Sequence, residues 1–259
     1  MTAAVEFVDV SKRFPNMSHP ALDHVSLTIE EGEFVTVLGT SGGGKTTLIK
    51  LINRLHDPDS GTVLVDGVDV QKVNPVQLRR GIGYVIQQTG LFPHMTVRDN
   101  IATVPKILKW DKQRIDARVD ELLNMVHLEP SEFRDRYPGQ LSGGQQQRVG
   151  LVRALAAEPK IMLLDEPFGA IDAITRSTLQ DEIQKIHSES SKTFIFVTHD
   201  IAEAFKLGTK VLVIDQGVVQ QYAAPEEIQR HPATEFVKEL LRSSEWMSQL
   251  GYVSEGAGL

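Results

Sequence analysis

A glycine-rich stretch early in the chain constrains the fold more than any other feature. It occupies residues 39–47 and fits the pattern G-x-x-x-x-G-K-[ST]. An apolar run at residues 34–38 precedes it, and residues 48–55 carry apolar side chains at helical spacing. This order of strand, loop and helix is the setting in which such a loop binds phosphate. The alternative is a glycine-rich turn without a ligand.

The loop predicts how a nucleotide would be held. Glycines let backbone N–H groups curl around a β-phosphate, and the start of the following helix adds positive dipole at the same place. Lys45 is expected to reach the β- and γ-phosphates, and the Thr46 hydroxyl is a ligand that Mg²⁺ accepts. The residues predicted to bind the phosphates are Gly39, Thr40, Ser41, Gly42, Gly43, Gly44, Lys45, Thr46 and Thr47.

Short apolar runs alternate with helical patterns along the chain, which predicts an α/β fold. Nearly continuous apolar strands are typical of a mostly parallel sheet that helices cover on both faces. The predicted strands are residues 34–38, 82–86, 161–164, 194–197 and 211–214. A turn at residues 57–62 leads into a small strand pair near 62–70, which we expect to belong to an antiparallel β subdomain.

The middle of the chain predicts an inserted helical subdomain. Residues 88–158 are poor in strand patterns, and helical periodicity fills most of 112–128 and 145–157. We predict one nucleotide-binding domain over residues 1–229 that contains this insertion. Residues 230–259 are expected to form a C-terminal helical extension and a polar tail.

Composition excludes several classes of protein. Lys and Arg number 27 against 34 Asp and Glu, for a formal charge of −7, which argues against a basic nucleic-acid-binding face. The chain has no cysteine, which excludes a disulfide scaffold and a thiolate metal site. We expect no signal peptide, and no apolar run approaches the ~18 residues that span a bilayer. A membrane role is therefore expected to require a partner.

Two adjacent acids end one of the apolar strands. Asp165 and Glu166 follow residues 161–164, and carboxylates at a strand end are costly unless they are used. Asp165 is predicted to hold Mg²⁺, and Glu166 to orient or deprotonate an attacking water. The alternative is a solvated pair that closes the strand.

Two further polar residues follow predicted parallel strands. His199 comes after residues 194–198, and Gln87 comes after residues 82–86. Ligands bind open α/β sheets at the carboxyl ends of the strands, so we expect both residues near the phosphate loop. His199 is predicted to hydrogen-bond a γ-phosphate, and Gln87 to touch Mg²⁺ or the water. A structural histidine and a polar loop are the alternatives.

A third motif, L-S-G-G-Q at residues 141–145, opens the predicted helix at 145–157. Ser142 is a favourable N-cap, and the glycines after it expose backbone N–H groups, which predicts a second anion site without a lysine. A capped helix is the alternative. Together with the phosphate loop, Gln87, the acid pair and His199, the motif resembles the signature of ABC ATPases. The resemblance covers about residues 3–240.

The resemblance implies further site residues and a partner. Residues 169–172 resemble the D-loop, with Asp172 at its end and Ile171 where leucine is usual. Phe14 resembles the aromatic residue that stacks on adenine. In the family two copies pack head to tail, so that the signature of one covers ATP held by the other. Each site then needs the partner copy's signature residues, here Ser142, Gly143, Gly144 and Gln145.

Shorter stretches resemble importers. Residues 165–170, D-E-P-F-G-A, and residues 91–97, where a permease coupling helix docks in the family, are similar to importer subunits. Four stretches resemble the quaternary-amine (osmoprotectant) uptake branch of the family: residues 52–55, 84–88, 104–110 and 174–176.

The resemblance implies an ATP-hydrolysing subunit on the cytoplasmic face of the membrane. It would drive a permease that imports glycine betaine, choline or carnitine. A substrate-binding protein would be an indirect partner. Many members carry tandem CBS modules at the C-terminal end, and we expect none within residues 1–259. An importer of another solute, an exporter and a non-transport ABC ATPase remain alternatives.

Overall fold

Two β-sheets organise the structure, a computed structural model that describes residues 2–15, 17–87, 90–169 and 171–243. The larger sheet has the strand order β10-β9-β3-β8-β7-β6, and all its neighbours are parallel except β9 and β10. Its strands are β3 (Phe34–Leu38), β6 (Ile82–Val85), β7 (Ile161–Asp165), β8 (Thr193–Val197), β9 (Lys210–Asp215) and β10 (Val218–Ala223). Every residue of β3, β7 and β8 is buried, which confirms the predicted parallel sheet with two covered faces.

The smaller sheet is antiparallel and has the order β2-β1-β4-β5. Its strands are β1 (Ala3–Lys12), β2 (Leu22–Glu30), β4 (Ser60–Val65) and β5 (Val68–Asp69). Sequence reasoning found only the pair near residues 62–70. It missed β2, although buried and exposed residues alternate there, as in any half-buried strand.

The first helix joins the two sheets. Residues of α1 (Lys45–Ile52) share one apolar cluster with the smaller sheet, for example Val5 and Val63, and with the larger sheet, for example Leu163. Because α1 begins at the lysine of the phosphate loop, both sheets fix the position of that loop. Two short elements follow β5, a 3-10 helix η1 (Val70–Lys72) and α2 (Pro75–Arg80).

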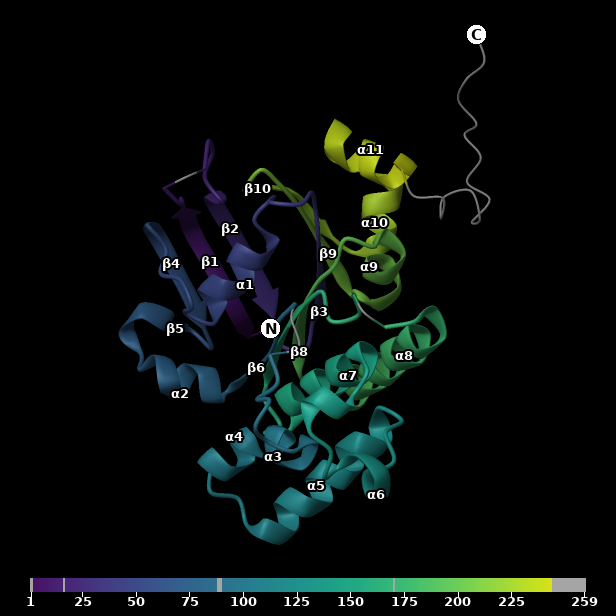
Figure 1. The fold of residues 1–259 in the computed structure, drawn as a ribbon. Helices are drawn as coiled ribbons and strands as arrows, with labels where there is room; N and C mark the ends of the chain where they lie inside the picture. The colour runs from purple at the N-terminus through teal and green to yellow at the C-terminus, as the bar shows by residue number, and fades with distance from the viewer. Residues whose placement is uncertain (1, 16, 88–89, 170, 244–259) are drawn as a thin grey trace.

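Helices occupy the chain between β6 and β7, at the lower side of the view in Figure 1. They are α3 (Val97–Ile101), α4 (Thr103–Ile107), α5 (Lys112–Met125), α6 (Pro130–Phe133), the 3-10 helix η2 (Pro138–Gln140) and α7 (Gly143–Leu155). Leu122 and Val149 of these helices lie in one cluster with Phe34 and Phe196 of the larger sheet. The predicted helix-rich segment of residues 88–158 lies here, and its limits as a subdomain stay a prediction.

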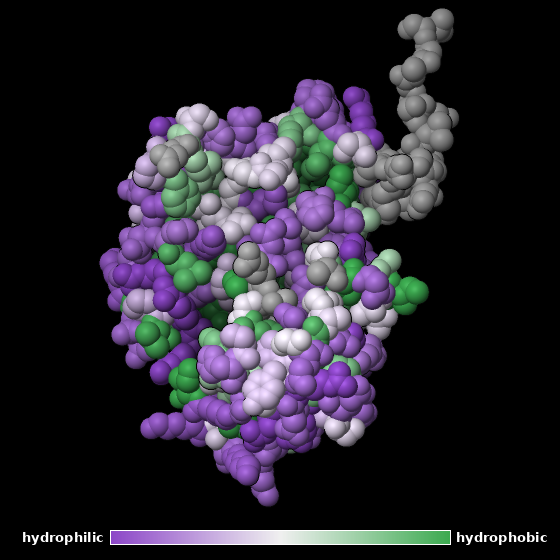
Figure 2. Space-filling model, in the orientation of Figure 1, coloured by the Kyte–Doolittle hydropathy of each residue, from purple (hydrophilic) through white to green (hydrophobic). Residues whose placement is uncertain are grey.

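Four helices complete the described chain: α8 (Ala173–Glu189), α9 (Ile201–Leu207), α10 (Pro225–Arg230) and α11 (Glu235–Ser243). Pro232 separates α10 from α11, because proline cannot continue a helix. Helix α11 lies within residues 230–259, and the assignment of that range as a C-terminal extension stays a prediction. The predicted polar tail lies within residues 244–259, outside the described residues. None of the described helices has the length and apolar character that a bilayer-spanning segment needs. Hydrophilic residues cover most of the face shown in Figure 2.

Candidate functional site

The phosphate loop lies between β3 and α1, and its glycines are needed for its shape. Gly39 has φ +156°, and a Cβ at this position would lie 1.8 Å from the carbonyl oxygen of Ile214. Gly44, just before α1, is left-handed at φ +107°. The Lys45 ammonium turns back over the loop and donates to the carbonyl oxygens of Gly39 at 2.9 Å and Thr40 at 2.8 Å. Burial lowers the pKa of Lys45, and the charges of the nearby acids oppose that change.

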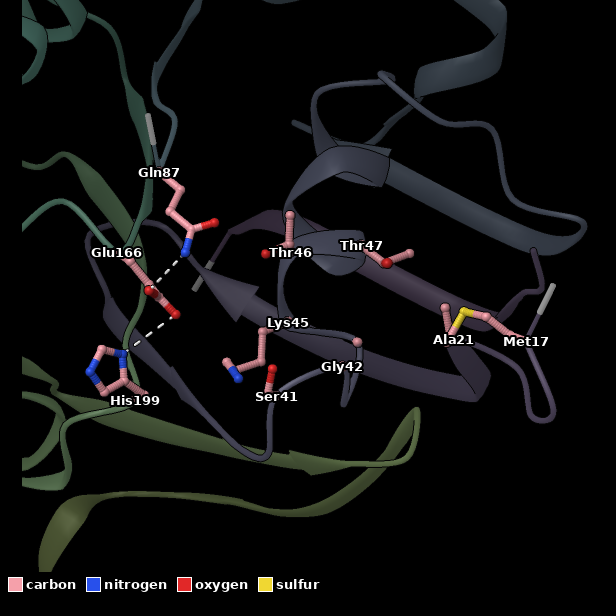
Figure 3. Close-up of a pocket in the computed structure, with 11 residues that line it drawn as sticks. Met17, Ala21, Ser41, Gly42, Lys45, Thr46, Thr47, Gln87, Glu166 and His199 are labelled. Carbon is pink, nitrogen blue, oxygen red and sulfur yellow. Dashed lines mark hydrogen bonds and ion pairs between the residues drawn. The ribbon is translucent and has the colours of Figure 1, made fainter. Parts of the chain in front are cut away.

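A cavity of about 510 Å³ opens over this loop, which is within the usual size of small-ligand sites. Figure 3 shows the loop on one side of the cavity and three polar side chains from the larger sheet on the other. The lining residues are Met17, Ala21, Ser41, Gly42, Gly44, Lys45, Thr46, Thr47, Gln87, Glu166 and His199. The structure therefore brings together the residues that sequence reasoning placed at the carboxyl ends of separate strands.

Glu166 is the centre of the polar side of the cavity. It follows β7 directly, and its φ of 48° is a left-handed conformation that non-glycine residues adopt at a cost. Gln87 Nε2 donates to Glu166 Oε2 at 3.1 Å, and His199 Nδ1 lies 3.5 Å from Glu166 Oε1 (Figure 3). The carboxylate is thus held between the residues that follow β6 and β8.

Asp165 and Thr46 form a pair of oxygen groups beside Glu166. The Thr46 hydroxyl donates to Asp165 Oδ1 at 3.1 Å, and Asp165 is only 4% exposed. Burial raises the pKa of the Asp165 carboxyl, while the hydrogen bond from Thr46 opposes the rise. A buried carboxylate next to a hydroxyl at the foot of a phosphate loop fits Mg²⁺, which takes few protein ligands together with phosphate oxygens.

The signature residues lie apart from this cavity. Ser142 caps α7, and it exchanges two hydrogen bonds with Gln145: Gln145 N–H to Ser142 Oγ at 3.3 Å, and Ser142 N–H to Gln145 Oε1 at 2.9 Å. A Cβ at Gly143 would meet no described atom within 4 Å, so open space adjoins this helix start. Gly144 follows in the same first turn. None of these four residues is among the described residues that line the cavity.

Asp172 also caps a helix. Its carboxylate accepts a hydrogen bond from the Thr175 N–H at 3.0 Å at the start of α8, and this bond lowers the pKa of the carboxyl. Asp172 is likewise absent from the described lining of the cavity. Ala170, in the middle of the predicted D-loop, lies outside the described residues.

Phe14 packs beside the described lining of the cavity's loop side without belonging to that lining. Its ring packs edge-on against His56, with 5.1 Å between ring centroids, and Lys12 Nζ lies 5.6 Å from its centroid. Met17 and Ala21 line the cavity, whereas Phe14 is not among its described lining residues. Sequence reasoning missed these two apolar residues, since a lone methionine in a polar loop gives no periodic signal. Adenine stacking by Phe14 stays a prediction.

The fold and the site define an α/β nucleotide-binding protein with a phosphate loop. A model of the family "ABC transporter" matches residues 22–169, and the chain belongs to this family. The solved dimer of the ATP-binding cassette MJ0796 bound to ADP and Pi is similar to it, with a TM-score of 0.78 and 36% identity over 85% of this chain and 98% of that chain.

Curated relatives are similar over most of the chain. The glycine betaine/carnitine/choline transport ATP-binding protein OpuCA of Bacillus subtilis is 52% identical over 85% of this chain and 58% of its own length. The glycine betaine uptake system ATP-binding protein YehX of Escherichia coli is 47% identical over 93% of this chain and 77% of its own. The chain spans about three fifths of the length of OpuCA and of the choline transport ATP-binding protein OpuBA.

Proposed function

We propose that the chain hydrolyses ATP in a head-to-tail pair with a second copy and so drives solute import through a separate membrane permease. One observation carries the proposal: Glu166, held by Gln87 and His199, faces the phosphate loop across a single cavity. A carboxylate in this position is placed to act on a water that attacks a bound γ-phosphate.

Each side chain has a distinct task in this reaction. The loop N–H groups and Lys45 bind and orient the phosphates, so the Lys45 ammonium must leave its two carbonyl partners when the nucleotide enters. Glu166 accepts the proton of the attacking water, and His199 hydrogen-bonds the γ-phosphate. Thr46 and Asp165, with Gln87, would hold Mg²⁺, which supplies positive charge at the phosphate oxygens.

The separation of the signature residues from the cavity supports a head-to-tail pair of two copies of the chain. Ser142, Gly143, Gly144 and Gln145 present a helix start to open space, which is an anion site without an anion-binding side chain. The cavity of the same chain is lined by Lys45 and Glu166 but lacks this helix start among its described lining residues. Two copies related by a two-fold axis would complete both sites at once. Asp172, which is exposed at the start of α8, would then face the second copy.

Another, smaller cavity of about 290 Å³ supports a permease contact. It lies between the larger sheet and the helices that follow β6, and Tyr84, Phe92, Val104 and Arg153 are among its lining residues. Phe92 belongs to the 91–97 stretch that resembles importer subunits. Docking of a permease segment here would place the ATPase at the cytoplasmic face of the membrane as a peripheral subunit, supplied with solute by a binding protein.

The proposed solute is a quaternary amine such as glycine betaine, carnitine or choline. The names of the relatives OpuCA and YehX support this class. The test is uptake of the three labelled solutes by the native cell under salt stress, with the chain replaced by Lys45→Ala. Lys112→Ala, an exposed lysine at the start of α5, is the matched control.

Loss of uptake of one solute in Lys45→Ala alone would establish both the transport role and the substrate. Unchanged uptake of all three would contradict the quaternary-amine assignment and favour an importer of another solute or an exporter.

A further inference from the structure

Glu203, in the first turn of α9, is a buried carboxyl group that the proposed reaction does not use. It is 8% exposed. Its Oε2 accepts a hydrogen bond from the Thr198 hydroxyl at 2.7 Å, and its Oε1 accepts one from Gln180 Nε2 at 3.1 Å. Burying a carboxyl group is costly unless such partners compensate it. An exposed acidic residue would stabilise the first turn of a helix equally well. The helix start therefore does not explain why Glu203 is buried.

The contacts of Glu203 enclose the loop that carries His199. Thr198, which precedes the histidine, donates its hydroxyl to Glu203 and accepts the Asp200 N–H at 3.0 Å. Asp200, which follows the histidine, accepts the Glu203 N–H at 3.1 Å through its carboxylate. Both neighbours of His199 are therefore tied to Glu203.

This arrangement differs from an ordinary capping box. The sequence D-x-x-E at residues 200–203 would let the glutamate side chain bond to the N-cap N–H. In the structure the Thr198 hydroxyl takes that N–H, and the Glu203 carboxyl binds the hydroxyl in turn. The glutamate thus reaches across the loop instead of closing the helix end.

Helix α8 anchors the other side of the carboxyl group. Besides Gln180, Arg176 approaches it, with 3.9 Å between Arg176 Nε and Glu203 Oε1. Arg176 also donates to the carbonyl oxygen of Ile171 at 3.1 Å. A small cavity of about 70 Å³ lies between these groups, and Glu166 and His199 form part of its wall. The Glu203 network therefore lies directly behind the proposed catalytic pair.

The position of His199 depends on the loop that carries it, because its own side chain makes few contacts. It is 72% exposed, and its ion-pair contact is Glu166 at 3.5 Å. We propose that Glu203 is a positioning residue for ATP hydrolysis, which fixes the Thr198–Asp200 loop against α8 so that His199 stands at the γ-phosphate. The inference rests on the proposed function.

The test compares Glu203→Gln with an exposed control, Glu226→Gln in α10. A glutamine has one acceptor and one donor, so its NH₂ would face the hydroxyl of Thr198 or the NH₂ of Gln180. Thr198→Val removes the hydroxyl and keeps the shape of the side chain. For each full-length variant the measurements are kcat at saturating Mg-ATP, the ATP dissociation constant and Tm.

We expect Glu203→Gln and Thr198→Val to lower kcat about 10-fold while the ATP dissociation constant changes less than about 2-fold, because the loss occurs after binding. Glu226→Gln should match the unsubstituted chain. The same comparison is made in a His199→Ala background, with ATP hydrolysis measured in single turnovers. There, adding Glu203→Gln should change the hydrolysis rate less than about 2-fold, because both substitutions remove the same function, that of His199.

Two outcomes would overturn the inference: an unchanged kcat in Glu203→Gln with only Tm lowered, or the same 10-fold loss in the His199→Ala background. If Glu203→Gln does not fold, Thr198→Val decides by the same criteria. An unsubstituted chain that hydrolyses no ATP would instead contradict the proposed function, so the two failures are distinguishable.

Discussion

At the scale of single residues, Glu166 combines a left-handed backbone with two polar contacts at the cavity. Its φ of 48° belongs to a region that costs a non-glycine residue about 1–3 kcal/mol. The strained turn directs the carboxylate toward Gln87 and His199 at the mouth of the cavity (Figure 3). The strain and the contacts together support its proposed role as the base.

Glu166→Gln is expected to bind ATP normally and to lose about 10²–10⁴-fold in turnover, because an amide cannot accept the proton of the water. ATP titration and phosphate release measure the two quantities. Glu158→Gln, an exposed glutamate in the turn after α7, is a suitable control. Turnover within a factor of two of the unsubstituted chain would refute the base assignment.

Asp165→Asn is expected to raise the stability of the nucleotide-free chain and to abolish ATP turnover. Burial raises the pKa of Asp165, so its ionised form costs folding free energy above that pKa. At pH 7 and without nucleotide, the Asp165→Asn variant should have a higher Tm than the unsubstituted chain. The gain should vanish as the pH falls below the carboxyl pKa, where the native group is also neutral. Thermal unfolding at several pH values checks this.

In the same variant, or on chelation of Mg²⁺, ATP turnover should disappear, because the proposed oxygen ligands or their ion are gone. A lower Tm at pH 7 combined with full Mg²⁺-dependent turnover would contradict both parts of the argument.

Single residues were predictable where a motif encodes chemistry. The phosphate loop, the acid pair, Gln87 and His199 all line or border one cavity, as their positions after strands indicated. The place of Phe14 was not predictable, because it depends on the loop between β1 and β2 and on contact with His56. Glu203 was missed for a similar reason: its partners come from α8 and from the end of β8.

At the scale of elements, β9 shapes the phosphate loop from outside it. The carbonyl oxygen of Ile214 in β9 occupies the space next to Gly39, and the Asp215 carboxylate accepts the Thr40 hydroxyl at 2.6 Å. The loop conformation is therefore a property of the β3–β9 pair as much as of its own glycines.

Gly39→Ala is expected to destabilise the fold, because the added Cβ would overlap the Ile214 carbonyl group; a cost of about 1–3 kcal/mol is typical of overpacking. Gly143→Ala, whose Cβ would point into open space, should leave the free energy of unfolding nearly unchanged and lower only ATP turnover. Denaturant unfolding of both variants measures the difference. Equal stabilities would show that the loop is not held by β9.

Elements were predicted as far as their periodicity is simple. The parallel strands appear as nearly continuous apolar runs, and the β3, β7 and β8 predictions agree with the structure within a residue. Helix α8 was not predicted, because only Leu179, Gln180 and Ile183 are buried along its 17 residues. Such a weakly apolar stripe is set by tertiary packing and leaves little pattern in the sequence.

At the scale of the whole molecule, each half of the proposed ATP site lies on a different part of the chain. The phosphate loop and Glu166 line the cavity, while the signature lies at the start of α7, outside the described lining. At the start of α8, Ile174 is 82% exposed, an apolar side chain two residues after the helix cap Asp172. A second copy would cover these residues and supply the missing anion-binding groups.

The most direct test of the account is the mass in solution of Glu166→Gln with and without Mg-ATP. Slow turnover should trap the closed pair, so light scattering should give twice the chain mass of 28.7 kDa with Mg-ATP and a single mass without it. Glu166→Gln combined with Ser142→Arg should stay at the single mass while still binding ATP. A single mass for Glu166→Gln with saturating Mg-ATP, or pairing that survives Ser142→Arg, would contradict the composite site.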